Sequence, residues 1–256
     1  MHIEVNSVGH RYGVRSGTVL DRISFGVARS ERLAVIGRSG CGKSTLLQII
    51  AGLLTPTTGE VRIHRRAVAA PSPRCTLMFQ RPLLFPWFDV ASNVALALRF
   101  AGRQVEAPAQ VGRLLQLVGL AGYEKARVTE LSGGQQKRVA LARSLAVDPE
   151  ILLLDEPFSA LDPVTRDELR QEIGAIVKKR KITLLLVSHD VDDALQLADR
   201  AIVMASYPGR IVADIALPSV PLGSTDYADQ RSQLLASFEP ERTTDQSPHG
   251  ELALPI

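Results

Sequence analysis

The chain has 256 residues, of which 45% are hydrophobic and 22% charged, a composition typical of a folded protein that can bury a full core. No apolar run approaches the roughly 20 residues that a membrane-spanning helix needs, and residues 1–20 lack the apolar centre of a signal peptide. The net charge of +3 is small, and no basic stripe with interleaved aromatic residues argues for nucleic-acid binding. We therefore expect a cytoplasmic protein that binds no nucleic acid.

The first quarter of the chain alternates apolar runs with turn residues, which predicts strands. These strands are expected at residues 2–8, 18–27, 33–36 and 60–64. They indicate an antiparallel sheet attached to the core of the protein. Tyr12 lies in the loop between the first two strands, where its ring either stacks on a purine base or covers the edge of the sheet.

A glycine-rich loop, GRSGCGKST at residues 37–45, lies between a predicted strand and the helical pattern of residues 46–54. It fits the phosphate-loop pattern G-x-x-x-x-G-K-[ST] in the strand–loop–helix context that this pattern requires. Its glycines allow successive N–H groups to face one concavity at a helix N-terminus, which favours an anion. A turn that only joins strand to helix is the alternative. The candidate nucleotide-binding residues are Gly37, Arg38, Ser39, Gly40, Cys41, Gly42, Lys43, Ser44 and Thr45.

Within this loop, residue chemistry divides the tasks. We expect Lys43 to reach the β- and γ-phosphates and the hydroxyl of Ser44 to ligate Mg²⁺. The two cysteines, Cys41 and Cys75, form neither a disulfide framework nor a metal-ligand spacing. We expect both to be small space-fillers in a reducing compartment.

Gln80 ends an apolar strand predicted at residues 75–79. The next segment, residues 81–88, is rich in aromatic residues and interrupted by prolines, so it cannot form a regular helix or a central strand. Such an apolar loop either folds back into the core or contacts a partner. We favour a partner contact.

Residues 90–146 have helical periodicity, which predicts a helical lobe at about residues 88–147 inserted between strands of the core. Ser132 is well suited to cap the last of these helices, which begins in the sequence LSGGQ. Apolar residues share one helix face in each of two sets, which are Val94, Ala97, Leu98 and Ala101, and Val111, Leu114, Leu115 and Val118.

The uninterrupted apolar run at residues 151–154 predicts a parallel strand buried on both faces, and residues 182–187 predict a second buried strand. The first run ends in Asp155 and Glu156, and the second is followed by His189. Ligands gather at the carboxyl ends of parallel strands. We expect Asp155 to hold Mg²⁺ and Glu156 to polarise an attacking water as general base. A simple Asp-Glu-Pro turn is the alternative.

The remaining elements close the core. Asp162 and Pro163 predict the start of a helix, and the basic run at residues 178–181 suits its solvated end. Strands are expected at residues 201–204 and 210–215. Residues 241–256 are polar and contain proline, which predicts a disordered tail.

These motifs occur in an order that resembles the nucleotide-binding subunit of ATP-binding-cassette (ABC) transporters, over about residues 1–216. The resemblance implies an α/β fold with a P-loop NTPase (RecA-like) core, an antiparallel β subdomain and an inserted helical subdomain, in an ATPase domain of residues 1–240. The matching series is Tyr12, the phosphate loop, Gln80, LSGGQ at 131–135, LLLDEP at 152–157, SALD at 159–162 and His189.

The resemblance assigns roles to single residues. It implies that Gln80 contacts Mg²⁺ and the attacking water, and that His189 donates to the γ-phosphate while holding Glu156. It implies ATP and Mg²⁺ as cofactors, with Glu156, His189, Gln80 and Lys43 as catalytic residues and Ser44, Gln80 and Asp155 as metal ligands. It further implies that a second helix N-terminus binds the nucleotide of another cassette in a dimer, through Ser132, Gly133, Gly134 and Gln135.

Separate cassettes of this size resemble bacterial importers. The segment after Gln80 and the sequence YPGRI at residues 207–211 are similar to the nitrate, sulfonate and taurine branch, whereas Gln136-Lys137-Arg138 departs from it. The implied partners are permease subunits, with a periplasmic or lipid-anchored solute-binding protein acting through them, at the cytoplasmic face of the inner membrane. The alternatives are a cassette that powers export and a cassette without a transport function. The second is disfavoured because the sequence has no sustained heptads and no second phosphate loop.

Overall fold

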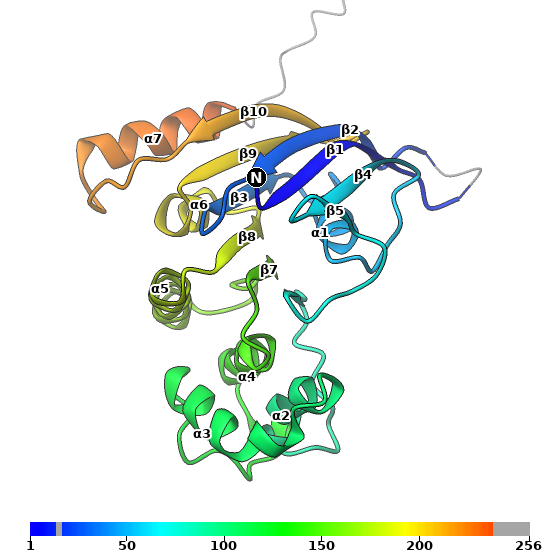
Figure 1. The fold of residues 1–256 in the computed structure, drawn as a ribbon. Helices are drawn as coiled ribbons and strands as arrows, with labels where there is room; N and C mark the ends of the chain where they lie inside the picture. The colour runs from blue at the N-terminus through cyan, green and yellow to red at the C-terminus, as the bar shows by residue number, and fades with distance from the viewer. Residues whose placement is uncertain (14–16, 238–256) are drawn as a thin grey trace, which may run out of the picture.

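The computed structural model describes residues 1–13 and 17–237. Two sheets lie above a group of helices in the orientation of Figure 1. No helix in this part of the chain is long and apolar enough to cross a membrane. The strands are β1 (Ile3–His10), β2 (Leu20–Val27), β3 (Arg32–Gly37), β4 (Thr58–Ile63), β5 (Arg66–Ala67), β6 (Cys75–Met78), β7 (Ile151–Asp155), β8 (Thr183–Ser188), β9 (Arg200–Ala205) and β10 (Arg210–Ala216). The helices are α1 (Lys43–Ile50), α2 (Val90–Phe100), α3 (Ala107–Leu117), α4 (Gly133–Leu145), α5 (Pro163–Arg180), α6 (Val191–Leu197) and α7 (Thr225–Ala236), with short 3-10 helices at Gln104–Glu106 and Val128–Glu130.

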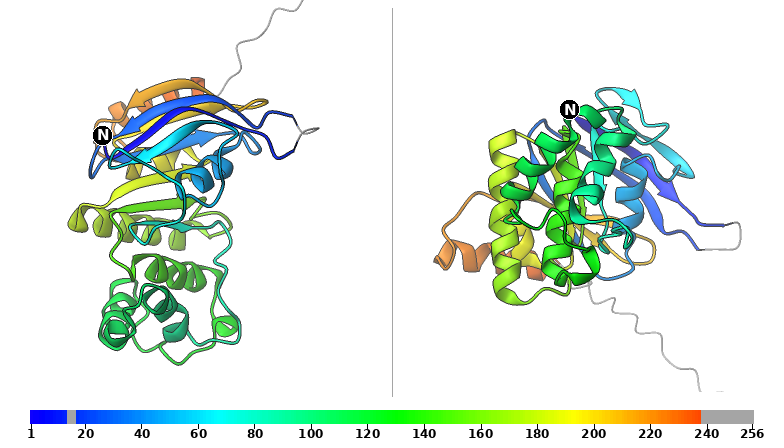
Figure 2. Two further views of the ribbon diagram at one scale, coloured as in Figure 1. Left: turned by 45° about the vertical axis from the view of Figure 1, so that its right-hand side comes forward. Right: turned by 90° about the horizontal axis from the view of Figure 1, so that it is seen from below.

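The strands form two sheets, as Figures 1 and 2 show. One is antiparallel with the order β2-β1-β4-β5, and the other has the order β10-β9-β3-β8-β7-β6. In the second sheet β10 pairs antiparallel with β9, and all other pairs are parallel. The carboxyl ends of β3, β7 and β8 therefore meet at one edge, where ligands bind in sheets of this kind.

Strands β7 and β8 are buried along their full length, as expected for two predominantly apolar parallel strands. Alternate side chains of β7 point to opposite faces of the sheet. Leu152 and Leu154 join the core formed with α2 to α5, and Ile151 and Leu153 join the core formed with α1 and the antiparallel sheet. The parallel sheet is thus covered on both sides.

Helices α2, α3 and α4 lie together at the end of the molecule opposite the antiparallel sheet (Figure 1). The apolar positions predicted to share a face of α3 are all buried in one core, with Leu114 and Leu115 fully excluded from solvent. Asp89 caps α2 by accepting a hydrogen bond from the backbone N–H of Ser92 at 2.7 Å. Amphipathic packing and capping together explain why this stretch is helical.

Several expectations differ from the structure in detail. Strand ends are displaced by one or two residues, and β5 and α7 were not predicted. The sequence of α7 is largely polar, and Leu234 is its only buried residue, so it lacks the apolar stripe that reveals most helices. Cys41 and Cys75 are buried free thiols, as expected, and burial raises the pKa of Cys75 to about 12. The predicted tail at residues 241–256 lies outside the described residues.

Candidate nucleotide-binding and catalytic site

The phosphate loop leaves β3 at Gly37 and enters α1 at Lys43. Gly40 and Gly42 have φ angles of 82° and 93°, a left-handed conformation that side chains with a Cβ seldom adopt. Gly42 is the N-cap of α1, and no side chain caps this helix end. A Cβ at Gly37 would lie 2.6 Å from the carbonyl oxygen of Met204. The chain therefore needs glycine here, and the N-terminal N–H groups of α1 are left without a side-chain acceptor.

Lys43 folds back over this loop. Its Nζ donates hydrogen bonds to the carbonyl oxygens of Gly37 at 2.7 Å and of Arg38 at 3.0 Å. Lys43 is 5% exposed, so its charge sits inside the loop that the sequence assigns to phosphate. A buried cation beside uncapped N–H groups makes this pocket suited to an anion.

Ser44 and Asp155 meet at the carboxyl end of β7. The Ser44 hydroxyl donates a hydrogen bond of 2.9 Å to Oδ1 of Asp155. Burial raises the pKa of Asp155, and the nearby charge of Glu156 adds to this effect. A hydroxyl and a buried carboxylate are hard oxygen donors of the kind that Mg²⁺ prefers, so the two residues fit a magnesium site.

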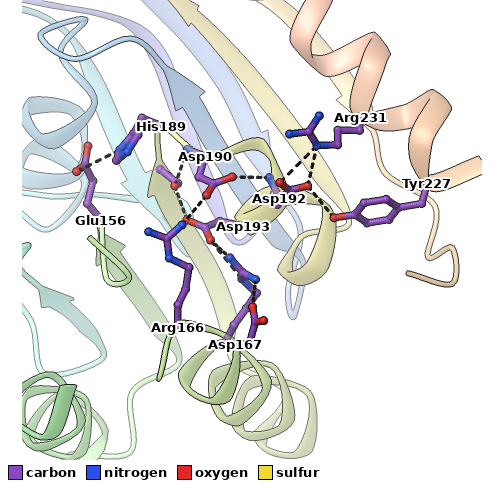
Figure 3. A network of polar contacts seen from close by, with 11 residues as sticks. Glu156, Arg166, Asp167, His189, Asp190, Asp192, Asp193, Tyr227 and Arg231 are labelled. Atoms are coloured by element: carbon purple, nitrogen blue, oxygen red, sulfur yellow. Dashed lines mark hydrogen bonds and ion pairs between the residues drawn. The ribbon is translucent and has the colours of Figure 1, made fainter. Parts of the chain in front are cut away.

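Glu156 lies between Gln80 and His189 (Figure 3 shows the histidine contact). Oε2 of Glu156 accepts a hydrogen bond from Nε2 of Gln80 at 3.1 Å and lies 3.4 Å from Nδ1 of His189. The backbone of Glu156 has φ 44°, a conformation that costs a residue of this type about 1–3 kcal/mol. Its N–H donates to the carbonyl oxygen of Val187 at 2.9 Å. This neighbouring strand holds the carboxylate in place.

Tyr12 reaches the start of α1 from the loop after β1. Its hydroxyl lies 2.9 Å from Oγ1 of Thr45, and its ring makes an edge contact with His10 at 4.9 Å between centroids. The side chain is nevertheless 60% exposed. The ring therefore stands beside the phosphate loop with surface free for a base.

The second predicted helix N-terminus lies elsewhere. Ser132 Oγ accepts a hydrogen bond from the N–H of Gln135 at 3.2 Å, and Gln135 Oε1 accepts one from the N–H of Ser132 at 2.9 Å. Ser132 and Gly133 are exposed, whereas a Cβ at Gly134 would lie 2.6 Å from Cγ2 of Thr165. Among the described residues, no hydrogen bond joins this segment to the phosphate loop. The fold thus gathers every other predicted site residue and leaves these four apart.

Behind His189 lies a polar network that the sequence did not reveal (Figure 3). Ser188 donates to Asp193 at 2.6 Å, and Arg166 donates to Asp190 at 2.8 Å. From α7, Tyr227 donates to Asp192 at 2.9 Å. This network fixes the turn that carries His189. The partners of Asp190 and Asp192 come from α5 and α7, so no local signal marks these two contacts.

Lys137 of α4 was singled out only as a departure from a family pattern. Its Nζ donates hydrogen bonds to the carbonyl oxygen of Ser159 and to Ser159 Oγ, the latter at 3.3 Å. Ser159 Oγ in turn donates to the carbonyl oxygen of Glu156 at 3.0 Å. Burial, together with the nearby charge of Arg166, lowers the pKa of Lys137 to about 8. Lys137 therefore connects α4 to the loop that contains Ser159 and follows Glu156.

Known proteins resemble this chain in sequence and in fold. A family model described as ABC transporter matches residues 20–159. An aliphatic sulfonates import ATP-binding protein of Bacillus cereus is 39% identical over 244 residues, which are 93% of this chain and 96% of the relative. A taurine import ATP-binding protein of Roseobacter denitrificans is 40% identical over 225 residues, 86% of this chain and 84% of the relative. A solved dimeric ATP-binding cassette in a post-hydrolysis state with ADP and Pi has a TM-score of 0.75 at 29% identity, covering 85% of this chain and 100% of that chain. The motif series, the fold and these matches agree, and the chain belongs to the ABC transporter family, of which it carries the ATP-binding and ATP-hydrolysing cassette.

Proposed function

We propose that the chain energises the uptake of a small organic anion, a sulfonate or taurine, as the ATPase subunit of a bacterial importer at the cytoplasmic face of the inner membrane. The import proteins named above support the substrate class. The observation that carries the catalytic part is the position of Glu156, whose carboxylate contacts both Gln80 and His189 next to the Ser44–Asp155 pair. Each residue in this constellation has a chemically suited task in ATP hydrolysis.

Binding of the nucleotide falls to the phosphate loop and to Tyr12. The N–H groups at the start of α1 and the Lys43 amine take the phosphates, for which Lys43 leaves the carbonyl oxygens that it now contacts. Tyr12 offers its exposed ring to the base. Mg²⁺, when bound, neutralises phosphate charge. Ser44 and Asp155 are the residues that would hold it, with Gln80 beside them.

Hydrolysis falls to Glu156. Its carboxylate takes a proton from the attacking water, and Gln80 and His189 orient that carboxylate and the water. His189 is 59% exposed at its side chain, so its outer ring nitrogen remains free to donate to a γ-phosphate. The polar network behind it limits its motion.

A second cassette completes the site. At the start of α4, the exposed residues Ser132 and Gly133 present an N–H group and a hydroxyl to whatever faces them. We assign this surface to the γ-phosphate of a nucleotide held by the partner's phosphate loop. ATP then closes the dimer and hydrolysis reopens it.

The permease contacts the aromatic segment, residues 83–88. Arg143 donates to the carbonyl oxygens of Pro82 and Leu83 at 2.6 and 2.8 Å, and the buried Asn93 accepts from the N–H of Phe85 at 2.8 Å. The backbone is thus fixed while Trp87 remains 72% exposed. A rigid, exposed aromatic cluster beside Gln80 is a suitable dock for an apolar helix.

Docking can be tested separately from catalysis. The double variant Phe85→Ala, Trp87→Ala should retain ATP binding but fail to co-purify with the permease. Phe100→Ala is the matched control because Phe100 is an aromatic residue of the same lobe and is 85% exposed. Normal co-purification of the double variant would reject this dock.

The substrate class is tested by reconstitution. The cassette, its permease and its solute-binding protein would be placed in liposomes with ATP and offered taurine, alkanesulfonates, nitrate or an uncharged solute. We expect ATP-dependent uptake of a sulfonate that the Glu156→Gln cassette does not support. Uptake of only the uncharged solute, or ATP-driven export, would contradict the proposal.

A further inference from the structure

A cluster of two imidazoles and a carboxylate lies away from the nucleotide site, where the two sheets meet. His2 directly precedes β1, His64 directly follows β4 and Glu150 directly precedes β7. The Nε2 atoms of His2 and His64 are 3.2 Å apart, and Oε2 of Glu150 lies 2.9 Å from His64 Nε2 and 3.7 Å from His2 Nε2. Three ligand atoms of a kind that binds metals therefore converge on one point.

The spacing matches coordination geometry. Tetrahedral Zn²⁺ holds imidazole nitrogen and carboxylate oxygen at about 2.0–2.2 Å, which places neighbouring ligand atoms roughly 3.3 Å apart. The three separations in the cluster span that value. Two histidines and one carboxylate also form a set that binds Zn²⁺ with one position open.

The backbone fixes each ligand independently of a metal. The N–H of His2 donates to the carbonyl oxygen of Val27 at 2.7 Å, and the N–H of His64 donates to the carbonyl oxygen of His2 at 3.1 Å. The carbonyl oxygen of Glu150 accepts from the N–H of Thr183 at 3.0 Å. Ligands held by sheet hydrogen bonds are preorganised, which reduces the entropy lost when a metal binds.

His2 also has the supporting contact that metal ligands generally need. Its Nδ1 lies 2.7 Å from Oγ1 of Thr183, and both side chains are buried. Such a bond on one ring nitrogen sets the orientation of the ring and leaves the other nitrogen to face a metal. Nε2 of His2 is the atom that faces His64 and Glu150.

The surroundings leave one side open. His64 and Glu150 have side chains 39% and 31% exposed, and they line a hollow with Arg29, Arg66 and Arg74. Arg74 lies 3.6 Å from the other carboxylate oxygen, Oε1, so Oε2 stays directed at the histidines. The positive charge of the arginines disfavours a metal cation without an anionic ligand. The same charge favours hydroxide or another anion at the open coordination position of a bound metal.

We propose that His2, His64 and Glu150 form a binding site for Zn²⁺ or a similar divalent transition metal, with its fourth position open to the arginine-lined hollow. Such a metal links β1 and β4 of the antiparallel sheet to β7 of the parallel sheet. The site is independent of the nucleotide and does not rest on the transport function.

The test uses the untagged full chain without nucleotide. Zn²⁺ affinity and stoichiometry would be measured by competition with a chromophoric chelator, and Co²⁺ spectra would report the ligand set. His64→Ala is the main variant because its side chain is partly exposed, and Glu150→Gln is the second. Glu106→Gln is the matched control, because it removes an exposed carboxylate of the helical lobe, where Glu106 pairs with Arg103. Cys75→Ser, next to the hollow, excludes a thiolate ligand.

We expect the wild-type protein to bind one Zn²⁺ per chain. Loss of the His64 side chain or of the Glu150 charge should weaken Zn²⁺ affinity by at least about 100-fold. The two control variants should bind Zn²⁺ with the affinity of the wild type. Zn²⁺ at a hundredfold excess over its Kd should raise the Tm of the wild-type protein by about 5 °C and leave that of His64→Ala unchanged. Absence of stoichiometric binding would overturn the proposal. So would equal affinity in His64→Ala, or loss of binding in Glu106→Gln or Cys75→Ser.

Discussion

Two helix N-termini in this molecule are assigned to the same ligand, yet they are built in opposite ways. Helix α1 begins at Gly42 with no side-chain cap and with Lys43 buried beside it. Helix α4 begins at Ser132 with a complete capping box formed with Gln135, in an exposed position. The N-terminus of α1 leaves its N–H groups available to a ligand inside the fold. The N-terminus of α4 satisfies some of its N–H groups with its own side chains and faces outward.

This difference indicates which of the two helix ends needs a partner chain. The α1 end lies next to Asp155 through Ser44, so the groups proposed to bind and cleave the nucleotide belong to one chain. The α4 end has no hydrogen bond to them within the described residues, so its role requires another chain. Changes at α1 should therefore act on a single cassette, and changes at the start of α4 should act only when two cassettes meet.

The largest expected effect is on the chemical step. Glu156→Gln keeps the shape of the side chain that contacts Gln80 but removes the carboxylate that acts as base. ATP turnover should therefore fall by about 10²-fold or more, while ATP binding persists. Steady-state ATPase assays and nucleotide-binding titrations measure the two quantities. Glu60→Gln, at a surface ion pair with Arg62, is the control. Near-normal turnover in Glu156→Gln would reject the base assignment.

Next in size is the loss of phosphate binding at α1. Lys43→Ala removes a charged hydrogen-bond donor, which should weaken ATP affinity by about 10–100-fold. Titration of a fluorescent ATP analogue into monomeric protein measures this. Lys125→Ala removes an exposed lysine of the helical lobe and should leave the affinity unchanged. An unchanged affinity in Lys43→Ala would show that the loop binds nucleotide without its lysine.

A smaller effect is expected at the start of α4. A Cβ at Gly133 meets nothing within 4 Å in the isolated chain, so Gly133→Ala should fold normally. In the dimer the added methyl group would press on the partner's nucleotide, and we expect ATPase activity to fall by about 10-fold. Gly112→Ala, another open helical glycine, is the matched control. Full activity of Gly133→Ala would argue against close contact at this helix end.

The smallest expected effect concerns Lys137, which joins α4 to Ser159. Because its folded pKa is lowered from 10.5 to about 8, the folded state holds the charged amine at a cost below pH 8, and this cost disappears as pH rises toward 10.5. Lys137→Gln should therefore be more stable than the wild type by about 1–2 kcal/mol at pH 7. Urea unfolding at pH 7 and pH 10 should show that difference shrinking. A difference that grows with pH would contradict this explanation.

Much of the core and site followed from local sequence. The phosphate loop can be recognised in the sequence because phosphate binding needs glycine, lysine and serine at fixed spacing between a strand and a helix. The buried strands before Asp155 and His189 are visible as largely apolar runs, since strands covered on both faces carry few polar positions. Gln80 is a candidate only through the order of the motifs, whereas Tyr12 is also indicated by its place in the loop between the first two strands.

What the sequence left out depends on contacts between distant segments. Helix α7 has one buried residue, Leu234, and it packs through polar contacts such as that of Tyr227 with Asp192. The pairing of Lys137 with Ser159 and the convergence of His2 with His64 likewise require the folded chain. No periodicity or spacing marks such residues.

In the ATP-bound dimer, we expect each nucleotide to lie between the α1 end of one chain and the α4 end of the other. The most direct test is a high-resolution structure of the Glu156→Gln variant with Mg²⁺ and ATP. We predict a head-to-tail dimer in which Ser132 and the N–H groups of Gly133 and Gly134 from one copy contact the γ-phosphate held by Lys43 of the other. A nucleotide-loaded structure in which the α4 ends face solvent would contradict the account.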